Sequence, residues 1–119
     1  MGNKKKKDRI ALRMEVLAFI RRFTNDGKHA DVIDCFTNGC CYYFANAIWL
    51  RFGNLVFDKD HKIEVVYDQV ANHFGCQIDD RVYDVTGDVT DKYKWESWFA
   101  FSKKDPVLTE RITRDCINF

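Results

Sequence analysis

The stretch GCCYYFANAIWLRF, residues 39–52, decides the fold, because it predicts a helix that is apolar on nearly every side. Only Asn46 and Arg51 are clearly polar within it. A helix on a protein surface keeps a wide polar face, whereas a helix that is apolar nearly all round is buried. We therefore expect this helix at the centre of the domain. Its principal buried face is expected to hold Cys41, Ala45, Ile48, Trp49 and Phe52.

The sequence before this helix predicts a second, amphipathic helix over residues 9–23, where an apolar stripe runs beside several arginines. The turn signal Asn25-Asp26-Gly27-Lys28 ends it, and residues 28–37 are expected to be irregular. After the central helix, the pattern changes to short segments rich in β-branched and aromatic residues, which predict an antiparallel meander. The expected strands are residues 55–57, 63–67, 70–78 and 81–85, separated by acidic turns at 58–60 and 79–80.

The C-terminal part of the sequence gives weaker signals. Residues 91–101 predict a short helix or an aromatic flap. Residues 108–119 fit a last strand or a last helix, and the pattern does not decide between them. The order of the elements, helices first and strands after them, predicts an α+β domain.

Length and composition predict one folded domain with free thiols. A chain of 119 residues with 46% apolar residues can bury its own core, and a net charge of +1 indicates neither a nucleic-acid nor a membrane partner. Residues 1–8 are expected to form a disordered basic tail, and residues 9–119 the single domain. Arg13 and Glu15 interrupt the apolar stretch that a signal peptide needs, and no run reaches the ~18 apolar residues of a membrane span. Five cysteines without an export signal therefore predict a reducing, cytoplasmic location.

Two adjacent cysteines, Cys40 and Cys41, fall in the first turn of the central helix. The unpaired N–H groups and the dipole at a helix N-terminus stabilise an anion, so a thiol there ionises more readily, as a nucleophile must at neutral pH. Helical phase favours Cys41, which shares a face with Ala45 and Ile48, and Cys40 is the alternative nucleophile. The competing interpretation is that both are small buried hydrophobic residues.

His73 and Asp84 are predicted to meet on one face of a hairpin. If Asp79 and Asp80 form its loop, paired residue numbers sum to 159, so that Gly75 faces Asp84. His73 and Asp84 then become diagonal neighbours, about 7 Å apart by backbone, and the missing side chain of Gly75 leaves room for their contact. A carboxylate in this place holds an imidazole in one tautomer, as the third member of a catalytic triad does. The side chains expected on this face are those of residues 73, 75, 82, 84 and 86, with Cys76 and Tyr83 on the other.

The central helix and the hairpin together resemble the papain-like cysteine peptidase superfamily. A small residue and a Cys that open an aromatic–Ala helix are followed by a strand His and by the strand motif Tyr83-Asp84-Val85-Thr86-Gly87. The sequence is most similar to compact bacterial and phage members, of the NlpC type or transglutaminase-like, over residues 38–90. This resemblance implies a papain-like fold, in which a central helix carrying the Cys packs on a small antiparallel sheet carrying the His and the Asp.

By that resemblance Cys41 is the nucleophile, His73 the base and Asp84 the residue that orients the base. The oxyanion hole would use the Cys41 backbone N–H and a second polar donor, for which Asn38 is the nearest candidate. The implied activity is hydrolysis or acyl transfer at an amide bond of a peptide, an isopeptide or a Gln side chain, through an acyl-enzyme and without a cofactor or metal. The expected partner is a protein or peptide substrate, and the sequence does not indicate the oligomeric state.

Two other functions fit the same residues. A zinc-binding module would use Cys35, Cys40 or Cys41, His73 and Cys76 as four ligands, although strand positions 73 and 76 point to opposite faces. A catalytically inert, papain-like interaction protein would share every structural expectation and differ only in the reactivity of its thiols.

Overall fold

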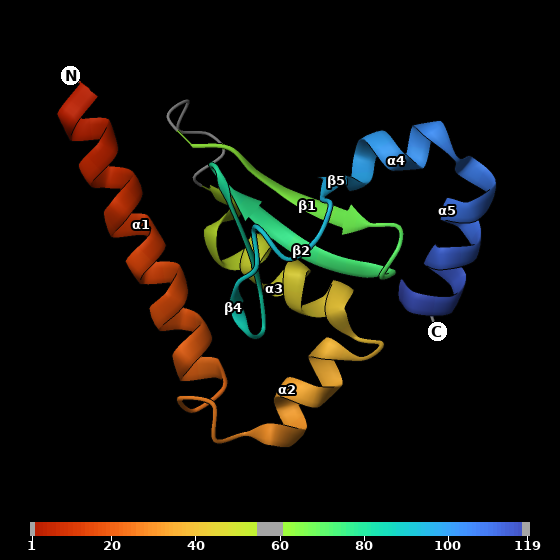
Figure 1. The fold of residues 1–119 in the computed structure, drawn as a ribbon, viewed down its shortest axis with the longest axis horizontal. Coiled ribbons are helices and arrows are strands. Elements are labelled where there is room, and N and C mark those ends of the chain that lie inside the picture. The colour runs from red at the N-terminus through yellow and green to blue at the C-terminus, as the bar shows by residue number, and fades with distance from the viewer. Residues whose placement is uncertain (1, 55–60, 118–119) are drawn as a thin grey trace.

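Helix α3, Cys41–Phe52, packs against one face of an antiparallel sheet in the computed structural model, which describes residues 2–54 and 61–117 (Figure 1). Helices α1, Gly2–Phe23, and α2, Ala30–Thr37, precede α3. The strands follow it, and helices α4, Trp98–Lys104, and α5, Pro106–Ile112, come last with the π-helical turn η2, Thr113–Ile117. Figure 1 shows α1 to the left of the sheet and α4 and α5 to its right, and all three helices contribute residues to the main core. The prediction of an α+β domain is confirmed.

The sheet has the strand order β4-β3-β2-β1-β5, and its described pairs are antiparallel. Cys76 pairs with Tyr83 and Ile78 with Arg81, so the hairpin has the predicted register. The predicted strand at 55–57 lies outside the described residues. The strands are β1, Ile63–Asp68; β2, His73–Ile78; β3, Arg81–Asp84; β4, Gly87–Asp88; and β5, Glu96–Ser97.

Strand β2 begins at His73 rather than at the predicted residue 70, because residues 69–72 form a turn. The Asp68 carboxylate accepts hydrogen bonds from the backbone N–H groups of Val70 and Ala71, at 2.8 and 3.1 Å. Asn72 closes the turn in a left-handed conformation with φ of 51°. This turn makes His73 the first residue of its strand.

The main core lies between α3, α1 and the α3 side of the sheet. Helix α3 is buried on one face only, because Trp49 and Leu50 are 39% and 68% exposed. The prediction that Trp49 lies on the buried face is therefore wrong. Among the described residues, the sheet and the helices before α3 cover one side of it and leave the other to solvent. The residues of α3 that are buried are Cys41, Phe44, Ala45, Ile48 and Phe52.

Two helical segments differ from the prediction. Helix α1 begins at Gly2 rather than at residue 9, since lysine is a good helix former and no Gly or Pro separates the lysines from Arg9. Residues 30–37, predicted as irregular, form α2. Val32, Ile33 and Phe36 have the i, i+1, i+4 spacing of an apolar helix face, and Asp31 lies in the first turn, where the helix dipole favours it.

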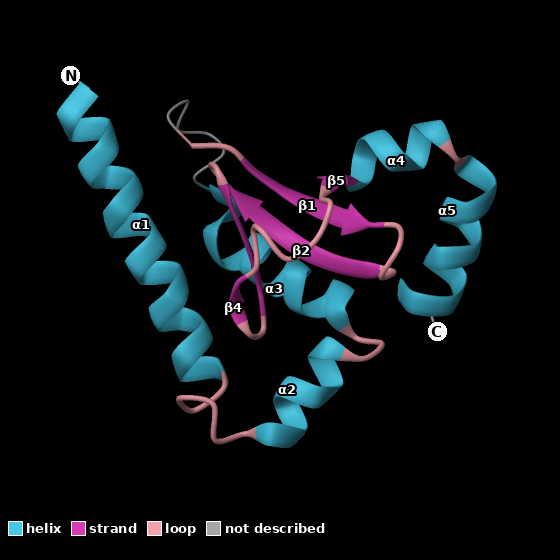
Figure 2. Ribbon diagram, in the orientation of Figure 1, coloured by secondary structure: helices cyan, strands magenta, loops and turns pink. Residues whose placement is uncertain are grey.

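The C-terminal part is mostly helical (Figure 2), which decides between the helix and strand alternatives for it. The Ser97 hydroxyl accepts a hydrogen bond from the Ala100 N–H and so caps α4. The Asp105 carboxylate caps α5 in the same way through the Leu108 N–H, and Pro106 occupies the first turn, where its missing N–H has no effect. No helix in the described part of the chain has both the length and the apolar character needed to cross a membrane.

A smaller apolar cluster covers the opposite face of the sheet. It contains Val66, Val82 and Val89, with Tyr93 and Trp95 packed against them. Gly75 is required here, because a Cβ atom on it would lie 2.8 Å from Val82 Cγ1 and 3.2 Å from the Trp95 ring. The space above Gly75 was predicted to serve the contact between His73 and Asp84, but Val82 and Trp95 fill it.

Candidate active site: Cys41, His73 and Asp84

Three segments that are distant in sequence bring Cys41, His73 and Asp84 together. Cys41 is the first residue of α3, His73 the first of β2 and Asp84 the last of β3. Because β2 and β3 are antiparallel, the start of one and the end of the other lie at the same end of the sheet. Helix α3 packs against both strands and presents its N-terminus there. The three residues are 7%, 5% and 5% exposed, respectively.

Asp84 holds the imidazole of His73. The His73 Nε2 atom lies 2.9 Å from Asp84 Oδ2. The other carboxylate oxygen, Oδ1, accepts hydrogen bonds from the Thr86 N–H at 2.7 Å and from the Thr86 hydroxyl at 2.5 Å. Burial raises the pKa of Asp84, but these hydrogen bonds outweigh it and hold the pKa below its ordinary value. Asp84 is therefore a carboxylate that keeps His73 in one orientation.

The thiol of Cys41 interacts with His73, and this interaction lowers the pKa of the thiol. Since Nε2 faces Asp84, the ring nitrogen left for the thiol is Nδ1. The backbone N–H groups of Phe74 and Tyr42 also favour the ionised sulfur and lower its pKa. Cys40 is the N-cap residue of α3 without a side-chain hydrogen bond to the helix, so its side chain does not compete for those amides. Burial raises the pKa of Cys41, and the interactions with His73, Phe74 and Tyr42 more than reverse this, so the pKa is lowered.

The His73 imidazole has a pKa raised to about 9. Burial alone would lower it, but the interactions with Asp84 and Cys41 favour the charged ring more strongly. The lowered pKa of the thiol and the raised pKa of the imidazole both favour transfer of the thiol proton to His73. The arrangement thus favours a thiolate–imidazolium pair near neutral pH.

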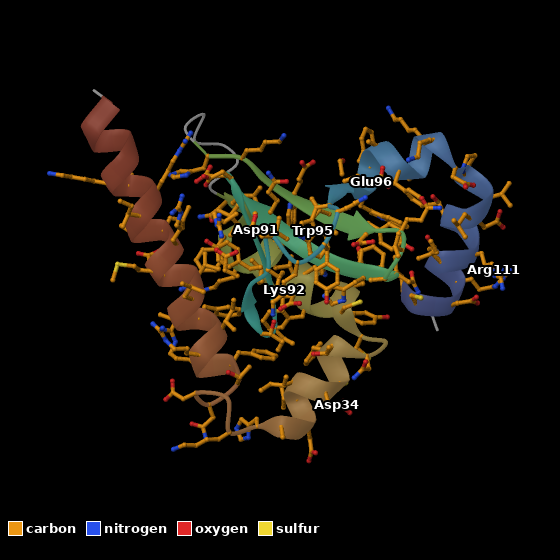
Figure 3. All side chains as sticks on the ribbon, in the orientation of Figure 1. Asp34, Asp91, Lys92, Trp95, Glu96 and Arg111 are labelled. Carbon is orange, nitrogen blue, oxygen red and sulfur yellow. The ribbon has the colours of Figure 1, made fainter. Side chains whose placement is uncertain are left out.

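Two aromatic rings cover the imidazole. The ring centroids of Tyr93 and Trp95 lie 4.9 and 5.9 Å from that of His73. Figure 3 shows Trp95 over the sheet, on the segment that joins β4 to β5. The Trp95 indole N–H donates to the Val89 carbonyl at 3.1 Å, so a hydrogen bond within this segment holds the Trp95 ring in place. The rings shield the His73–Asp84 hydrogen bond from water.

A hollow of about 400 Å³ lies next to the site, between the β1–β2 turn and the C-terminal helices. Asn72, which precedes His73, forms part of its wall, and so does Tyr67, whose ring packs on Phe74 at 4.8 Å. The Tyr67 hydroxyl donates to Asn72 Oδ1 at 2.7 Å. The sequence did not predict this hollow, because residues from η2 and α5 complete it and their structure was undecided. Those residues are Leu108, Arg111, Ile112, Asp115 and Cys116, with Gln69 from the turn.

The other predicted site residues are placed differently. The Cys40 thiol interacts with Cys35, which raises the pKa of Cys40, with burial as a second cause. The amide of Asn38 is exposed and donates to Asp34 Oδ1 at 2.8 Å, so one of its two N–H donors is already engaged. Cys76 is completely buried in the main core, and burial raises its pKa to about 12. Within residues 2–54 and 61–117, no group of three or more His, Cys, Asp or Glu residues has an arrangement that could hold a metal ion.

Comparison with known proteins identified no relative of this chain. No protein-family model matches the chain, and neither the curated proteins nor the solved structures contain a significant match to it.

Proposed function

We propose that the protein is a cysteine-dependent hydrolase or acyl transferase that acts on amide bonds, with Cys41 as nucleophile. The observation that supports this most is the buried group of Cys41, His73 and Asp84, in which His73 lies 2.9 Å from Asp84 and lowers the pKa of the Cys41 thiol. The position of the thiol at a helix N-terminus and the directions of the pKa shifts agree with it. The papain-like superfamily has its Cys, His and Asp in this chain order, with the Cys on a helix that packs against an antiparallel sheet. The same arrangement here supports a papain-like fold.

The reaction follows from these positions. The Cys41 thiolate attacks the carbonyl carbon of the amide, and a C–S bond forms as the carbonyl oxygen becomes an oxyanion. The backbone N–H of Cys41 at the start of α3 is in the right place to stabilise this charge. The imidazolium of His73 gives its proton to the leaving nitrogen, the C–N bond breaks and an acyl-enzyme remains. Water or an amine then attacks the thioester while His73 takes up the incoming proton, and Cys41 is released.

The hollow beside Asn72 is the candidate for substrate binding. Its apolar wall from Tyr67, Leu108 and Ile112 suits an aliphatic part of a peptide, and its rim carries amide groups and the charged pair Arg111 and Asp115. A peptide, an isopeptide or a Gln side chain meets this description. Hydrolysis, deamidation and acyl transfer all use the same acyl-enzyme, so the proposal covers these three outcomes.

Alkylation with mapping of the modified thiol tests this proposal. The protein is treated with a limiting amount of iodoacetamide near pH 6.5, and bound zinc is measured on the same sample. We expect selective labelling of Cys41, which is lost in His73→Ala, and no zinc. Zinc in stoichiometric amount with protected cysteines would contradict the proposal. Slow and uniform labelling of the five thiols would also contradict it, and would support an inert interaction protein instead.

A further inference from the structure

Helix α2 ends in a turn that joins it directly to α3. The Cys40 N–H donates to the Cys35 carbonyl at 3.3 Å, across five residues, and the Asn38 N–H donates to the Asp34 carbonyl at 2.9 Å. Between them, Gly39 has a left-handed φ of +103°. A bond across five residues over a left-handed glycine is the signature of a Schellman motif, which ends many helices.

This motif places the side chains of Cys35 and Cys40 next to each other. In a Schellman motif, the residue after the left-handed glycine contacts the residue five positions before it in the helix. Here these two positions are both cysteines, and the proximity of Cys35 raises the pKa of the Cys40 thiol. Cys35 is exposed and Cys40 is half-buried, so a reagent from solvent meets Cys35 first. Two cysteines whose backbones are already joined by the hydrogen bond of this motif need little backbone movement to reach the geometry of a disulfide.

We propose that Cys35 and Cys40 form a redox-active dithiol, which closes to an intrachain disulfide when it meets a small disulfide such as oxidised glutathione. The exposed Cys35 thiolate attacks one sulfur of the oxidant, an S–S bond forms and one glutathione thiolate leaves. The Cys40 thiolate then attacks Cys35 Sγ in this mixed disulfide and releases the second glutathione. Two protons pass from the cysteines to the two glutathiones. The two cysteines are oxidised by two electrons in total and the glutathione disulfide is reduced by two.

Cys41 takes no part in this exchange. Although it follows Cys40 directly, its thiol interacts with His73 and lies in the candidate active site, 7% exposed. The dithiol therefore does not depend on the proposed hydrolase function, and the two proposals fail separately. Cys40 belongs to the turn and Cys41 to the site, which gives the adjacent pair of cysteines two different uses.

The test is equilibration of the reduced, folded protein in buffers with graded ratios of oxidised to reduced glutathione, followed by acid quenching and alkylation. We expect a fully reversible loss of two hydrogens in the intact mass. Chymotrypsin cleaves after Phe36, so a disulfide from Cys35 to Cys40 links two peptides that separate on reduction. Fragmentation of the second peptide should find Cys41 alkylated and Cys40 in the disulfide.

Three variants identify the partners. Cys41→Ser should form the disulfide with the same midpoint as the wild type, and Cys40→Ser should stop at glutathionylated Cys35. In Gly39→Ala the left-handed conformation is strained, so the equilibrium constant for closure should fall by about fivefold or more. Mixed disulfide that persists in the wild type would overturn the proposal. So would a disulfide that includes Cys41, or an unchanged constant in Gly39→Ala.

Discussion

Two histidine–carboxylate pairs, one buried and one half-buried, lie at opposite ends of the β2–β3 hairpin. At one end, His73 and Asp84 are 2.9 Å apart, with side chains that are each 6% exposed. At the other end, His61 Nδ1 lies 3.0 Å from Asp79 Oδ2, and these side chains are 10% and 7% exposed. In distance and side-chain exposure the two pairs are nearly equal, so neither property explains why one of them belongs to a candidate active site.

The two pairs differ in their other partners. His73 meets the Cys41 thiol, whereas the Asp79 carboxylate accepts the Lys62 N–H at 3.0 Å, and the Asp79 N–H donates to the Lys62 carbonyl at 2.7 Å. Asp79 thus clamps the residue before β1 to the hairpin turn, where its own φ is 58°. A histidine beside a carboxylate is therefore a structural contact at one end and part of the proposed nucleophilic site at the other. The thiol at a helix N-terminus makes the difference.

The largest expected effect is the difference between the two histidines in their influence on the reactivity of Cys41. His73→Ala should lower the rate constant for alkylation of Cys41 near pH 6.5 by about 100-fold, because a thiol with an ordinary pKa is only about 1% ionised there. The matched control His61→Ala should stay within about twofold of the wild type, provided that circular dichroism confirms its fold. Equal losses in the two variants would mean that the pairs do not differ in function.

The two carboxylates should differ in the same way: Asp84 should affect the reactivity of Cys41, and Asp79 should affect only stability. Asp84→Asn should slow the alkylation of Cys41 about tenfold near pH 6.5, since His73 loses the charge that supports its imidazolium form. Asp79→Asn should leave alkylation unchanged but lower the free energy of unfolding in urea by about 1–3 kcal/mol, because it weakens a half-buried clamp. A slow but fully stable Asp79→Asn protein would contradict this division.

A smaller effect is expected in the free energy of unfolding as the pH changes, and the pKa shifts of His73 and Cys41 determine its sign. The raised pKa of His73, about 9, contributes stability that is complete below the unfolded value of about 6.5 and is lost as the pH rises towards 9. The lowered pKa of Cys41 acts in the opposite sense, because its contribution is complete above the unfolded thiol pKa and is lost as the pH falls. Between about pH 6.5 and 8.5 the two slopes should cancel in the wild type.

Without the Cys41 thiol, the dependence of the free energy of unfolding on pH that His73 causes should no longer be cancelled. In Cys41→Ser, the free energy of unfolding should fall by about 1 kcal/mol from pH 6.5 to 8.5, while the control Cys35→Ser keeps the flat profile of the wild type. Urea titrations at several pH values measure this. A profile in Cys41→Ser as flat as that of the wild type would show that Cys41 and His73 do not share a proton.

The smallest expected effect is that of the Thr86 hydroxyl, whereas the donor described above for Asp79 is a backbone N–H, that of Lys62. Thr86→Val removes the hydroxyl that donates to Asp84 Oδ1 at 2.5 Å and keeps the backbone N–H that donates to the same atom at 2.7 Å. Because one of these hydrogen bonds remains, alkylation of Cys41 near pH 6.5 should slow only about twofold. A loss as large as that of Asp84→Asn would mean that Thr86, rather than His73, determines the state of this carboxylate.

The sequence predicted the helix of Cys41, the hairpin register and the shared face of His73 and Asp84, because these depend on local periodicity and on one acidic turn. It did not reveal the pairing of His61 with Asp79, because the charged neighbours of His61 in sequence do not indicate a partner 18 residues away in the β2–β3 turn. The hollow beside Asn72 was also beyond prediction, since it forms only when η2 and α5 pack near the β1–β2 turn. The sequence also suggested the wrong reason for Gly75. Its missing side chain was expected to make room for the contact between His73 and Asp84, but it makes room for Val82 and Trp95.

The central claim is that Cys41 is a thiolate near neutral pH, and the ultraviolet absorbance of thiolates tests it most directly. The difference between the wild type and Cys41→Ser, titrated in the native state, isolates this one sulfur. The account predicts that the thiolate absorbance is already present near pH 6.5 and disappears only on further acidification. A difference that appears only as the pH approaches about 8.5, as for an ordinary thiol, would contradict it.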